Sequence, residues 1–393
     1  MKNWVQHNKK NNTGNIRLKL LGLLACCTLG IAAYSQDFNL GVQSYQDGDY
    51  EVALSEFFPL GEQGNVIAQS YLGLMYENGQ GVAQDYVKAA KWYRKAAEQG
   101  EAYAQNNLGL LYQNGQGVTQ DYGEAEKWYR MAAEQGDARG QNNLGIMYDK
   151  GQGVIQDYGE AVKWYRMAAE QGDAYAQNNL GIMYDKGQGV PQDYRDAAKW
   201  YRMAAEQGNA HGQSNLGWLY QNGRGVTQDY GEAAKWYRMA AEQGNARGQS
   251  NLGGLFEIGQ GVPQNYKEAV KWYRMAAEQG EAYAQNNLGG LYQNGQVVTQ
   301  DYGEAAKWYR MAAELGDAYG QFKLGLLYYN GQGIPQNYVR AHVWFNLAAS
   351  QGENDEYASM RDTVEGLMTP EQVAEAQRLA ILWQPGTALN EWQ

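Results

Sequence analysis

The amino-acid sequence predicts an all-α fold, a right-handed superhelical α-solenoid of antiparallel helix pairs. The nine-residue string WYRMAAEQG occurs five times, starting at Trp128, Trp164, Trp200, Trp236 and Trp272, so it repeats every 36 residues. Periods of 20–50 residues are typical of solenoids, in which each unit packs only on its neighbours. Each period also contains two stretches with apolar residues at helical spacing, separated by glycine-rich segments.

Eight full units can be placed end to end, at 65–100, 101–136, 137–172, 173–208, 209–244, 245–280, 281–316 and 317–352. Residues 37–64 keep part of the pattern in phase, so we expect a degenerate N-terminal capping repeat there. Residues 353–393 break the period, and we predict a C-terminal helical cap and tail, with helices over 354–368 and 370–383. Terminal units of a solenoid need a polar outer face, and we expect the segments at both ends to cap the array in this way.

In the second unit, the first predicted helix runs from about Ala102 to Gln113. Its apolar residues follow the i, i+4, i+7, i+8 pattern from Ala104 onward. Gly109 lies inside this helix and recurs in every unit, although glycine costs about 1 kcal/mol relative to alanine in a helix. We therefore expect the partner helix to approach closely at this glycine.

The second predicted helix begins after Asp121, a favourable N-cap residue. Glu124 follows three residues later, as in a capping box. Trp128 belongs to the apolar stripe of this helix and is expected to anchor it in the core, because burying an indole contributes about 4–6 kcal/mol. Gly136 is predicted to end the helix in a left-handed conformation.

The string AQNNLGLLYQNGQGVTQDYGEAEKWYRMAAEQG resembles the Sel-one-like repeat, a tetratricopeptide-like helical hairpin. The resemblance covers residues 65–352 and implies an α-solenoid that serves as a protein-interaction scaffold. This chain departs from the pattern at Val297, which replaces a turn glycine, and at Phe345, Asn346 and Ser350. Some cysteine-rich relatives are associated with β-lactam hydrolysis, but this chain lacks the cysteines that mark them.

The first 35 residues predict a secretory signal peptide. A basic leader without acidic residues precedes the apolar run LLGLLACCTLGIAA at 20–33, and small residues suited to cleavage follow near Ser35. The run is short for a membrane span. We therefore expect the protein in the periplasm or secreted, with no stable membrane insertion after cleavage. An uncleaved anchor and a lipoprotein modified at Cys26 are the alternatives.

Cleavage would remove both cysteines, so no disulfide framework is expected. Five of the 32 basic residues and none of the 43 acidic ones lie in 1–35, which leaves 27 against 43 and a net charge of −16. Such an acidic chain argues against nucleic acid as a partner, because nucleic-acid binding needs a basic surface.

Differences between the near-identical units predict the binding surface. Within the first helix, positions 3, 6, 10, 13 and 14 of the unit vary and share one face, while the opposite face is constant. First helices line the concave side of such arrays, so the variable face is the candidate partner-binding surface. We select position 3 and the asparagines of position 7, together with one position-10 tryptophan, namely Tyr103, Arg139, Tyr175, His211, Arg247, Tyr283, Tyr319, Asn107, Asn143, Asn179, Asn215, Asn251, Asn287 and Trp218.

Trp218 lies next to a spot made shallow by Gly254 and Gly290, which occupy the same unit position in the next two units. Tyrosine, tryptophan and arginine are the residue types that anchor interfaces. Two other interpretations remain: the variable face could have drifted without selection, and Trp218 could merely fill the gap left by the glycines.

No catalytic constellation, metal-ligand cluster, phosphate loop or cofactor motif is found in the sequence. His211 and His342 are the histidines beyond the leader, and His342 is expected to be a packed or rim residue. We therefore predict a non-enzymatic scaffold or adaptor without cofactor or metal, whose partner is a protein or peptide. A glycan such as peptidoglycan or exopolysaccharide is the alternative ligand, and a β-lactamase-like or other hydrolase is the remote alternative.

Overall fold

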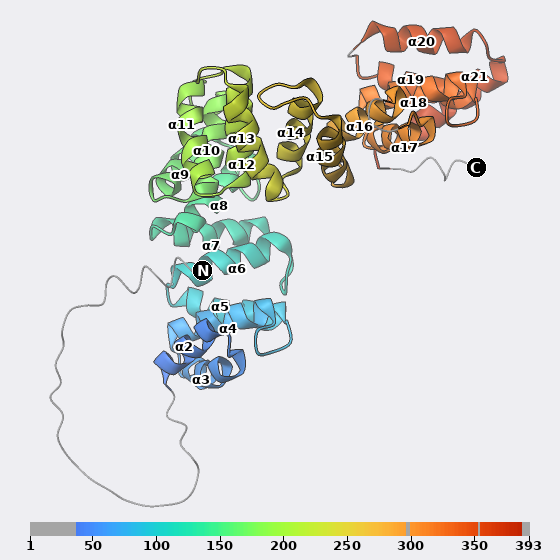
Figure 1. The fold of residues 1–393 in the computed structure, drawn as a ribbon. Coiled ribbons are helices and arrows are strands. Elements are labelled where there is room, and N and C mark those ends of the chain that lie inside the picture. The colour runs from blue at the N-terminus through green and yellow to red at the C-terminus, as the bar shows by residue number, and fades with distance from the viewer. Residues whose placement is uncertain (1–36, 296–298, 353, 387–393) are drawn as a thin grey trace, which may run out of the picture.

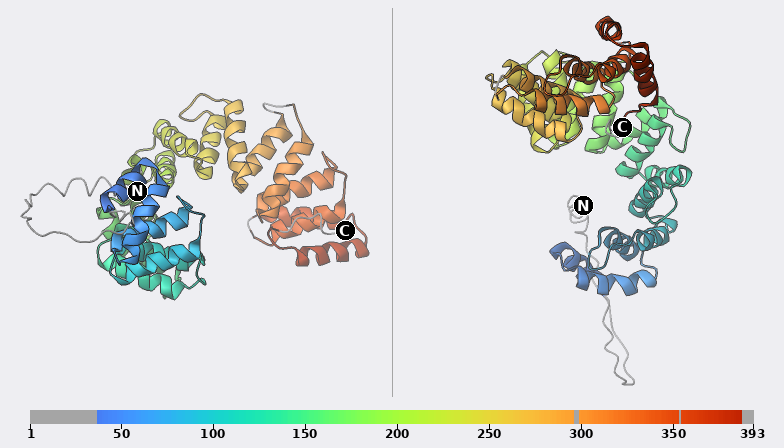
Figure 2. Two further views of the ribbon diagram at one scale, coloured as in Figure 1. Left: turned by 90° about the horizontal axis from the view of Figure 1, so that it is seen from below. Right: turned by 90° about the vertical axis from the view of Figure 1, so that its right-hand side faces the viewer.

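The computed structural model describes residues 37–295, 299–352 and 354–386, which contain twenty helices and no strand. The predicted signal peptide, Val297 and residues 387–393 of the tail lie outside the described residues. The all-α solenoid of antiparallel helix pairs is confirmed. In Figure 1 the array rises from α2 to α13 and then turns toward α21, and the left view of Figure 2 shows it bent into an arc.

The eight units have nearly the same helix bounds. The first helices are α4 (Val66–Asn78), α6 (Ala102–Asn114), α8 (Ala138–Lys150), α10 (Ala174–Lys186), α12 (Ala210–Asn222), α14 (Ala246–Ile258), α16 (Ala282–Asn294) and α18 (Ala318–Asn330). The second helices are α5 (Tyr86–Glu98), α7 (Tyr122–Glu134), α9 (Tyr158–Glu170), α11 (Tyr194–Glu206), α13 (Tyr230–Glu242), α15 (Tyr266–Glu278), α17 (Tyr302–Glu314) and α19 (Tyr338–Ala349).

One helix pair lies before these units and two helices follow them. The pair is α2 (Phe38–Asp47) and α3 (Tyr50–Glu62), and the final helices are α20 (Asp355–Glu365) and α21 (Pro370–Leu382). First helices of neighbouring units also touch each other, for example α6 with α8 and α12 with α14. This closer spacing places the first helices on the inner side of the array.

The core clusters extend across the boundaries between units. One cluster contains Tyr129 and two alanines of α7, Leu144 and Met147 of α8, and Trp164 of α9. Clusters of the same composition end in Trp200 and Trp236. Each first helix is therefore held between two second helices, and each tryptophan completes the core of the interface with the preceding unit.

The glycine inside each first helix lets the two helices of its own unit pack closely. A Cβ atom on Gly109 would lie 2.8 Å from the Tyr129 ring, so a side chain at this position would collide with the partner helix, as predicted. Gly117 in the turn has φ +69°, and a Cβ there would lie 2.1 Å from the Tyr86 carbonyl oxygen. Only glycine combines a left-handed conformation with so close an approach.

The helix ends follow the predicted signals, with one correction. The Asp121 carboxylate accepts hydrogen bonds from the backbone N–H groups of Gly123 and Glu124, so it is the N-cap. The capping box predicted with Glu124 does not form, because the Asp121 N–H donates to the Tyr112 carbonyl at 3.0 Å. The Glu124 carboxylate instead lies 3.5 Å from Lys127 Nζ.

A ladder of buried glutamines joins the units. Gln105 Nε2 donates to the Ala97 carbonyl at 3.0 Å, and Gln105 Oε1 accepts from Gln135 Nε2 at 2.7 Å. The pair recurs at 69/99, 141/171, 177/207, 213/243, 249/279 and 321/351. Unit seven has Leu315 where the donor glutamine should be, and Gln285 Oε1 is buried there without a partner.

We predict that Leu315→Gln stabilises the array. Leu315 is 50% exposed, and a glutamine there would donate to the unsatisfied Gln285 oxygen. An unsatisfied buried acceptor costs about 1–3 kcal/mol, so the free energy of unfolding should rise by about 1 kcal/mol. Denaturant titration, with hydrogen exchange of α16 and α17, measures the change.

The matched control is Gln243→Leu, which removes the donor to Gln213 at an intact rung. It should lower the free energy of unfolding by a similar amount. Equal stability of Leu315→Gln and the natural chain would show that the ladder contributes nothing.

Candidate functional site

The position-3 residues lie on the inner helices, and most of them are exposed. Arg139, Tyr175, His211, Arg247, Tyr283 and Tyr319 are all exposed, as expected for the variable face. Tyr103 differs, because it is half-buried and its ring centroid lies 6.4 Å from that of Tyr93. The Arg139 guanidinium lies 5.5 Å from the Tyr103 ring centroid, so both residues are engaged within the wall.

Several position-7 asparagines form hydrogen bonds between units. The amide of Asn143 donates to Asn106 at 2.9 Å, and Asn179 and Asn215 donate in the same way to Asn142 and Asn178. These three amides are therefore largely structural.

This asparagine ladder ends after Asn215, because position 6 is serine in the next two steps. Ser214 and Ser250 have no hydrogen-bond partner for their buried hydroxyls in the described part of the chain. The side-chain amide of Asn251 likewise makes no hydrogen bond with a described residue. For Asn107 and Asn287, too, position 6 of the preceding unit is serine. Their Nδ2 atoms are buried without a partner in the described part of the chain.

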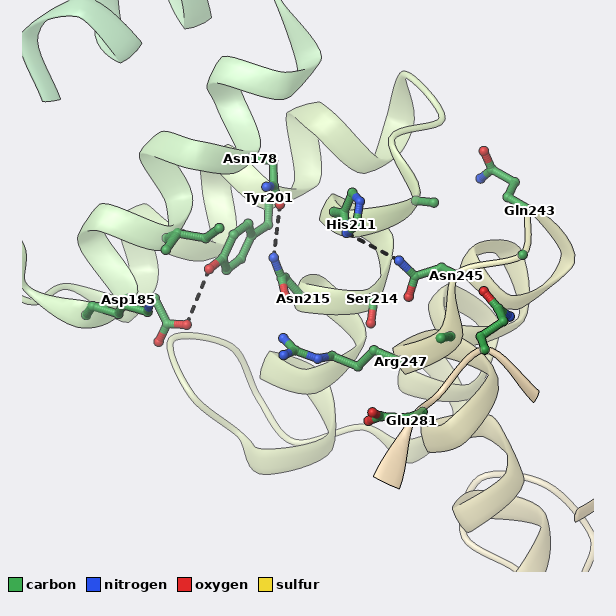
Figure 3. A pocket seen from close by; sticks show the side chains of 16 residues that line it. Asn178, Asp185, Tyr201, His211, Ser214, Asn215, Gln243, Asn245, Arg247 and Glu281 are labelled. Atoms are coloured by element: carbon green, nitrogen blue, oxygen red, sulfur yellow. Dashed lines mark hydrogen bonds between the residues drawn. The ribbon is translucent and has the colours of Figure 1, made fainter. Parts of the chain in front are cut away.

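Two adjoining hollows, of about 840 and 430 Å³, open on the inner face between α10 and α16. They share Asp185, Asn215, Arg247 and Glu281, and we call them together the central hollow (Figure 3). Six of the predicted residues line it, namely His211, Trp218, Arg247, Tyr283, Asn215 and Asn251. The other eight predicted residues do not, namely Tyr103, Arg139, Tyr175, Tyr319, Asn107, Asn143, Asn179 and Asn287.

Opposite charges face each other across the central hollow. Its lining contains two acidic residues, Asp185 and Glu281, and two basic ones, Lys186 and Arg247. In Figure 3 the Arg247 side chain extends into the hollow between Asp185 and Glu281. The Arg247 guanidinium nevertheless makes no hydrogen bond, ion pair or ring contact with the residues that the structure describes. The hollow is thus balanced in charge within a chain of net charge −11.

Glu281 was not selected from the sequence, because its unit position reads as an ordinary N-cap. In the other described helices the N-cap side chain accepts a backbone hydrogen bond, as Asp317 does from Gly320, but that of Glu281 does not. Asp185 occupies a variable position of the inner face, but the sequence did not distinguish it from the acids and amides at the equivalent positions.

Trp218 lines the smaller part of the central hollow, and Gly254 and Gly290 occupy the same unit position in the next two units. The Trp218 ring is half-buried, with the Arg224 guanidinium 4.8 Å from its centroid. A Cβ on Gly254 or Gly290 would meet only the hydroxyl of Tyr273 or Tyr309, at 3.4 and 3.6 Å. A Cβ atom at either glycine would therefore make only an ordinary van der Waals contact.

Among the described residues, no group of three or more histidine, cysteine, aspartate or glutamate side chains is placed to hold a metal ion. His342 is buried, as one of the two expectations had it, and its Nε2 lies 3.2 Å from Glu365 Oε2. None of the described helices is long and apolar enough to cross a membrane.

Comparisons with known proteins identify similar chains. A family model described as Sel1 repeat matches residues 66–101, 102–137, 138–173, 174–209, 210–245, 246–281, 282–317 and 318–353. The chain is 36% identical to c5321, described as a protective antigen of uropathogenic Escherichia coli strains with an SLR fold, over 87% of this chain and 90% of that one, with a TM-score of 0.48. It is 38% identical to a Sel1 repeat protein from Oxalobacter formigenes, over 60% and 94% of the two chains, with a TM-score of 0.57. A comparison with curated proteins gave no match.

Asp185 gives the central hollow a pH-dependent contribution to stability. Burial raises the pKa of its carboxyl, while the hydrogen bond from the Tyr201 hydroxyl at 3.3 Å and the charges of Arg224 and Lys186 oppose the rise. Because the folded-state pKa is raised, the neutral acid is favoured in the fold. Its stabilising effect is complete below the unfolded-state pKa and is lost as the pH rises through the folded-state pKa.

We predict that Asp185→Asn raises the free energy of unfolding at pH 7 by less than about 1 kcal/mol. The amide removes the buried charge and keeps an acceptor for Tyr201, as Gln221 does for Tyr237 at 2.7 Å. The difference from the natural chain should shrink as the pH falls toward 4, and denaturant titrations across this range measure it. A variant that is less stable at pH 7 would contradict the assignment.

Proposed function

The chain belongs to the Sel1 repeat family, and from this membership we propose that it is an exported, non-enzymatic scaffold that binds a protein or peptide partner along its inner groove. Sel1 repeat proteins share the solenoid fold and commonly serve as protein-interaction scaffolds. Family membership alone does not say which part of the array binds.

The central hollow is the observation that carries the proposal. Many side-chain amides of the array pair within the chain, in the glutamine and asparagine ladders. At the hollow, the side chains of Asn251 and Arg247 make no hydrogen bond with the described residues, although hydrogen-bonding groups in a folded protein normally find partners. A partner laid along the first helices would satisfy them.

Export is supported by the sequence of residues 1–35, with its basic leader, apolar run and small residues near Ser35. The proposed location is the periplasm or the exterior of a bacterial cell, and the partner would belong to the cell envelope.

A glycan is the second candidate ligand. Tyr283 is 56% exposed at the hollow, and the half-buried Trp218 lies beside it. Aromatic faces of this kind can pack on sugar rings. We favour a peptide because the lining also contains charged groups of both signs and the unpaired side-chain amide of Asn251, which suit a peptide main chain and its side chains better than neutral sugars.

We predict that the triple variant His211→Ala, Trp218→Ala, Arg247→Ala loses partner capture by more than about tenfold, because buried aromatic residues and arginines dominate interface energies. Capture is measured by affinity purification from the envelope fraction of the source cell and by quantitative mass spectrometry. Circular dichroism should show unchanged helix content.

The matched control changes three exposed methionines of the second helices, Met131, Met167 and Met203, to alanine. Capture should survive in this control. Equal capture by the triple variant and the natural chain would reject the inner groove as the binding surface, and selective capture of polysaccharide would favour the glycan.

A further inference from the structure

Arg247 lacks the contacts that its counterpart has in unit three. Arg139 and Arg247 occupy the same unit position, yet only Arg139 lies over an aromatic ring, that of Tyr103 at 5.5 Å. In the unit before Arg247, the same position is occupied by His211. The His211 ring nitrogen lies 3.3 Å from the Asn245 amide and does not offer a ring contact to Arg247. A guanidinium presents five donors in a fixed fork suited to a carboxylate. Arg247 therefore offers a carboxylate-binding group at the centre of the inner face.

Glu281 presents the opposite charge at the same place. At the equivalent position of unit two, the Glu101 carboxylate is occupied by the Ala104 N–H and the Ser70 hydroxyl. The Glu281 carboxylate accepts no hydrogen bond from any described residue, and it lines both parts of the central hollow. It is an acceptor available to a cationic group of a ligand.

Between these charges lies a polar wall with unused hydrogen-bonding capacity. Ser214 lines the hollow and is only 2% exposed, and its hydroxyl has no partner in the described part of the chain. The Asn251 amide in the adjoining part of the hollow is also unpaired. Asn215 uses its Nδ2 on Asn178 at 2.9 Å. Buried groups left without partners cost about 1–3 kcal/mol each, a cost that a bound ligand can offset.

Resting on the proposed function, we propose that the central hollow is the specificity subsite of the groove and binds an extended peptide segment with neighbouring side chains of opposite charge. A carboxylate of the segment pairs with Arg247, and an ammonium or guanidinium group pairs with Glu281. The Asn251 amide and the Asn215 Oδ1 atom, whose Nδ2 already donates to Asn178, bond the main chain between them.

Ligands of a single charge fit this arrangement less well. An acidic segment would satisfy Arg247 but would meet Glu281 and Asp185, and a basic segment would meet Arg247 and Lys186. Repulsion between like charges at close range is weak only when solvent screens it, and a hollow restricts that screening. A mixed-charge segment satisfies both signs at once.

The test uses fluorescein-labelled octapeptides and the chain from residue 36 onward, since residues 1–35 are the proposed leader. Four peptide sets share one neutral backbone sequence and differ at two adjacent positions, which are Glu-Lys in both orders, Glu-Glu, Lys-Lys or Gln-Gln. Fluorescence anisotropy at low and physiological salt should show one Glu-Lys order binding at least tenfold more tightly than the three other sets.

Variants assign the charges to the two residues. Arg247→Ala and Glu281→Gln should each weaken binding of the Glu-Lys peptide by about tenfold to a hundredfold, the effect of losing a charge-assisted hydrogen bond. The matched controls Arg139→Ala and Glu101→Gln should leave it unchanged. The double variant Arg247→Glu with Glu281→Arg should prefer the order opposite to the one that the natural chain prefers, a result that misfolding cannot produce.

Three results would overturn the subsite. They are equal binding of all peptide sets, equal losses in the Arg139 and Arg247 variants, and no change of preference in the double-reversal variant. If the partner captured from the envelope is lost by the triple variant but kept by Arg247→Ala and Glu281→Gln, the charge-reading subsite is wrong and the scaffold function stands. If every inner-face variant keeps both partner capture and peptide binding, the subsite and the proposed function of the inner groove are both rejected.

Discussion

The array depends on one repeated interaction, the insertion of each tryptophan into the interface with the preceding unit. Trp164 completes a cluster built from Tyr129 of α7 and Leu144 of α8. No unit therefore holds a complete core by itself, and stability is a sum over neighbouring pairs. The two helices of one unit are held together by neighbouring constant residues, since Gly109 makes room for the Tyr129 ring and Gln135 donates to Gln105, whose Nε2 in turn donates to the Ala97 carbonyl of the preceding unit. This explains why WYRMAAEQG hardly changes along the chain.

A framework that is the same in every unit cannot by itself select one place for a partner. Selection must come from the positions that differ between units, and these lie on the inner face of the first helices, away from the core. The change from asparagine to serine at Ser214 and Ser250 ends one hydrogen-bond ladder, and Glu281 leaves its capping role. These small departures occur next to each other in space, and together they leave both charges and amides unpaired at the central hollow.

Sequence reasoning predicted the helices, their N-caps and the close approach at Gly109, because each follows from local chemistry that recurs in every unit. It predicted the inner face for the same reason, and six of the fourteen selected residues line the hollow. It did not predict the failed capping box at Glu124, since the Asp121 N–H is taken by a carbonyl of the preceding helix. Nor could it separate Arg139 from Arg247 or Glu101 from Glu281. These are the same residue types at the same unit positions, and their different contacts depend on side chains of the neighbouring unit.

The placement of the core between units also bears on how the length of such a chain can change over generations. Duplicating or deleting one 36-residue segment near α6 or α8 joins surfaces that already match, so the fold would tolerate the change. The same event between α12 and α16 would move Arg247 away from Asp185 or from Glu281. The number of units is thus free to vary along most of the chain and is restricted where the hollow spans four successive units.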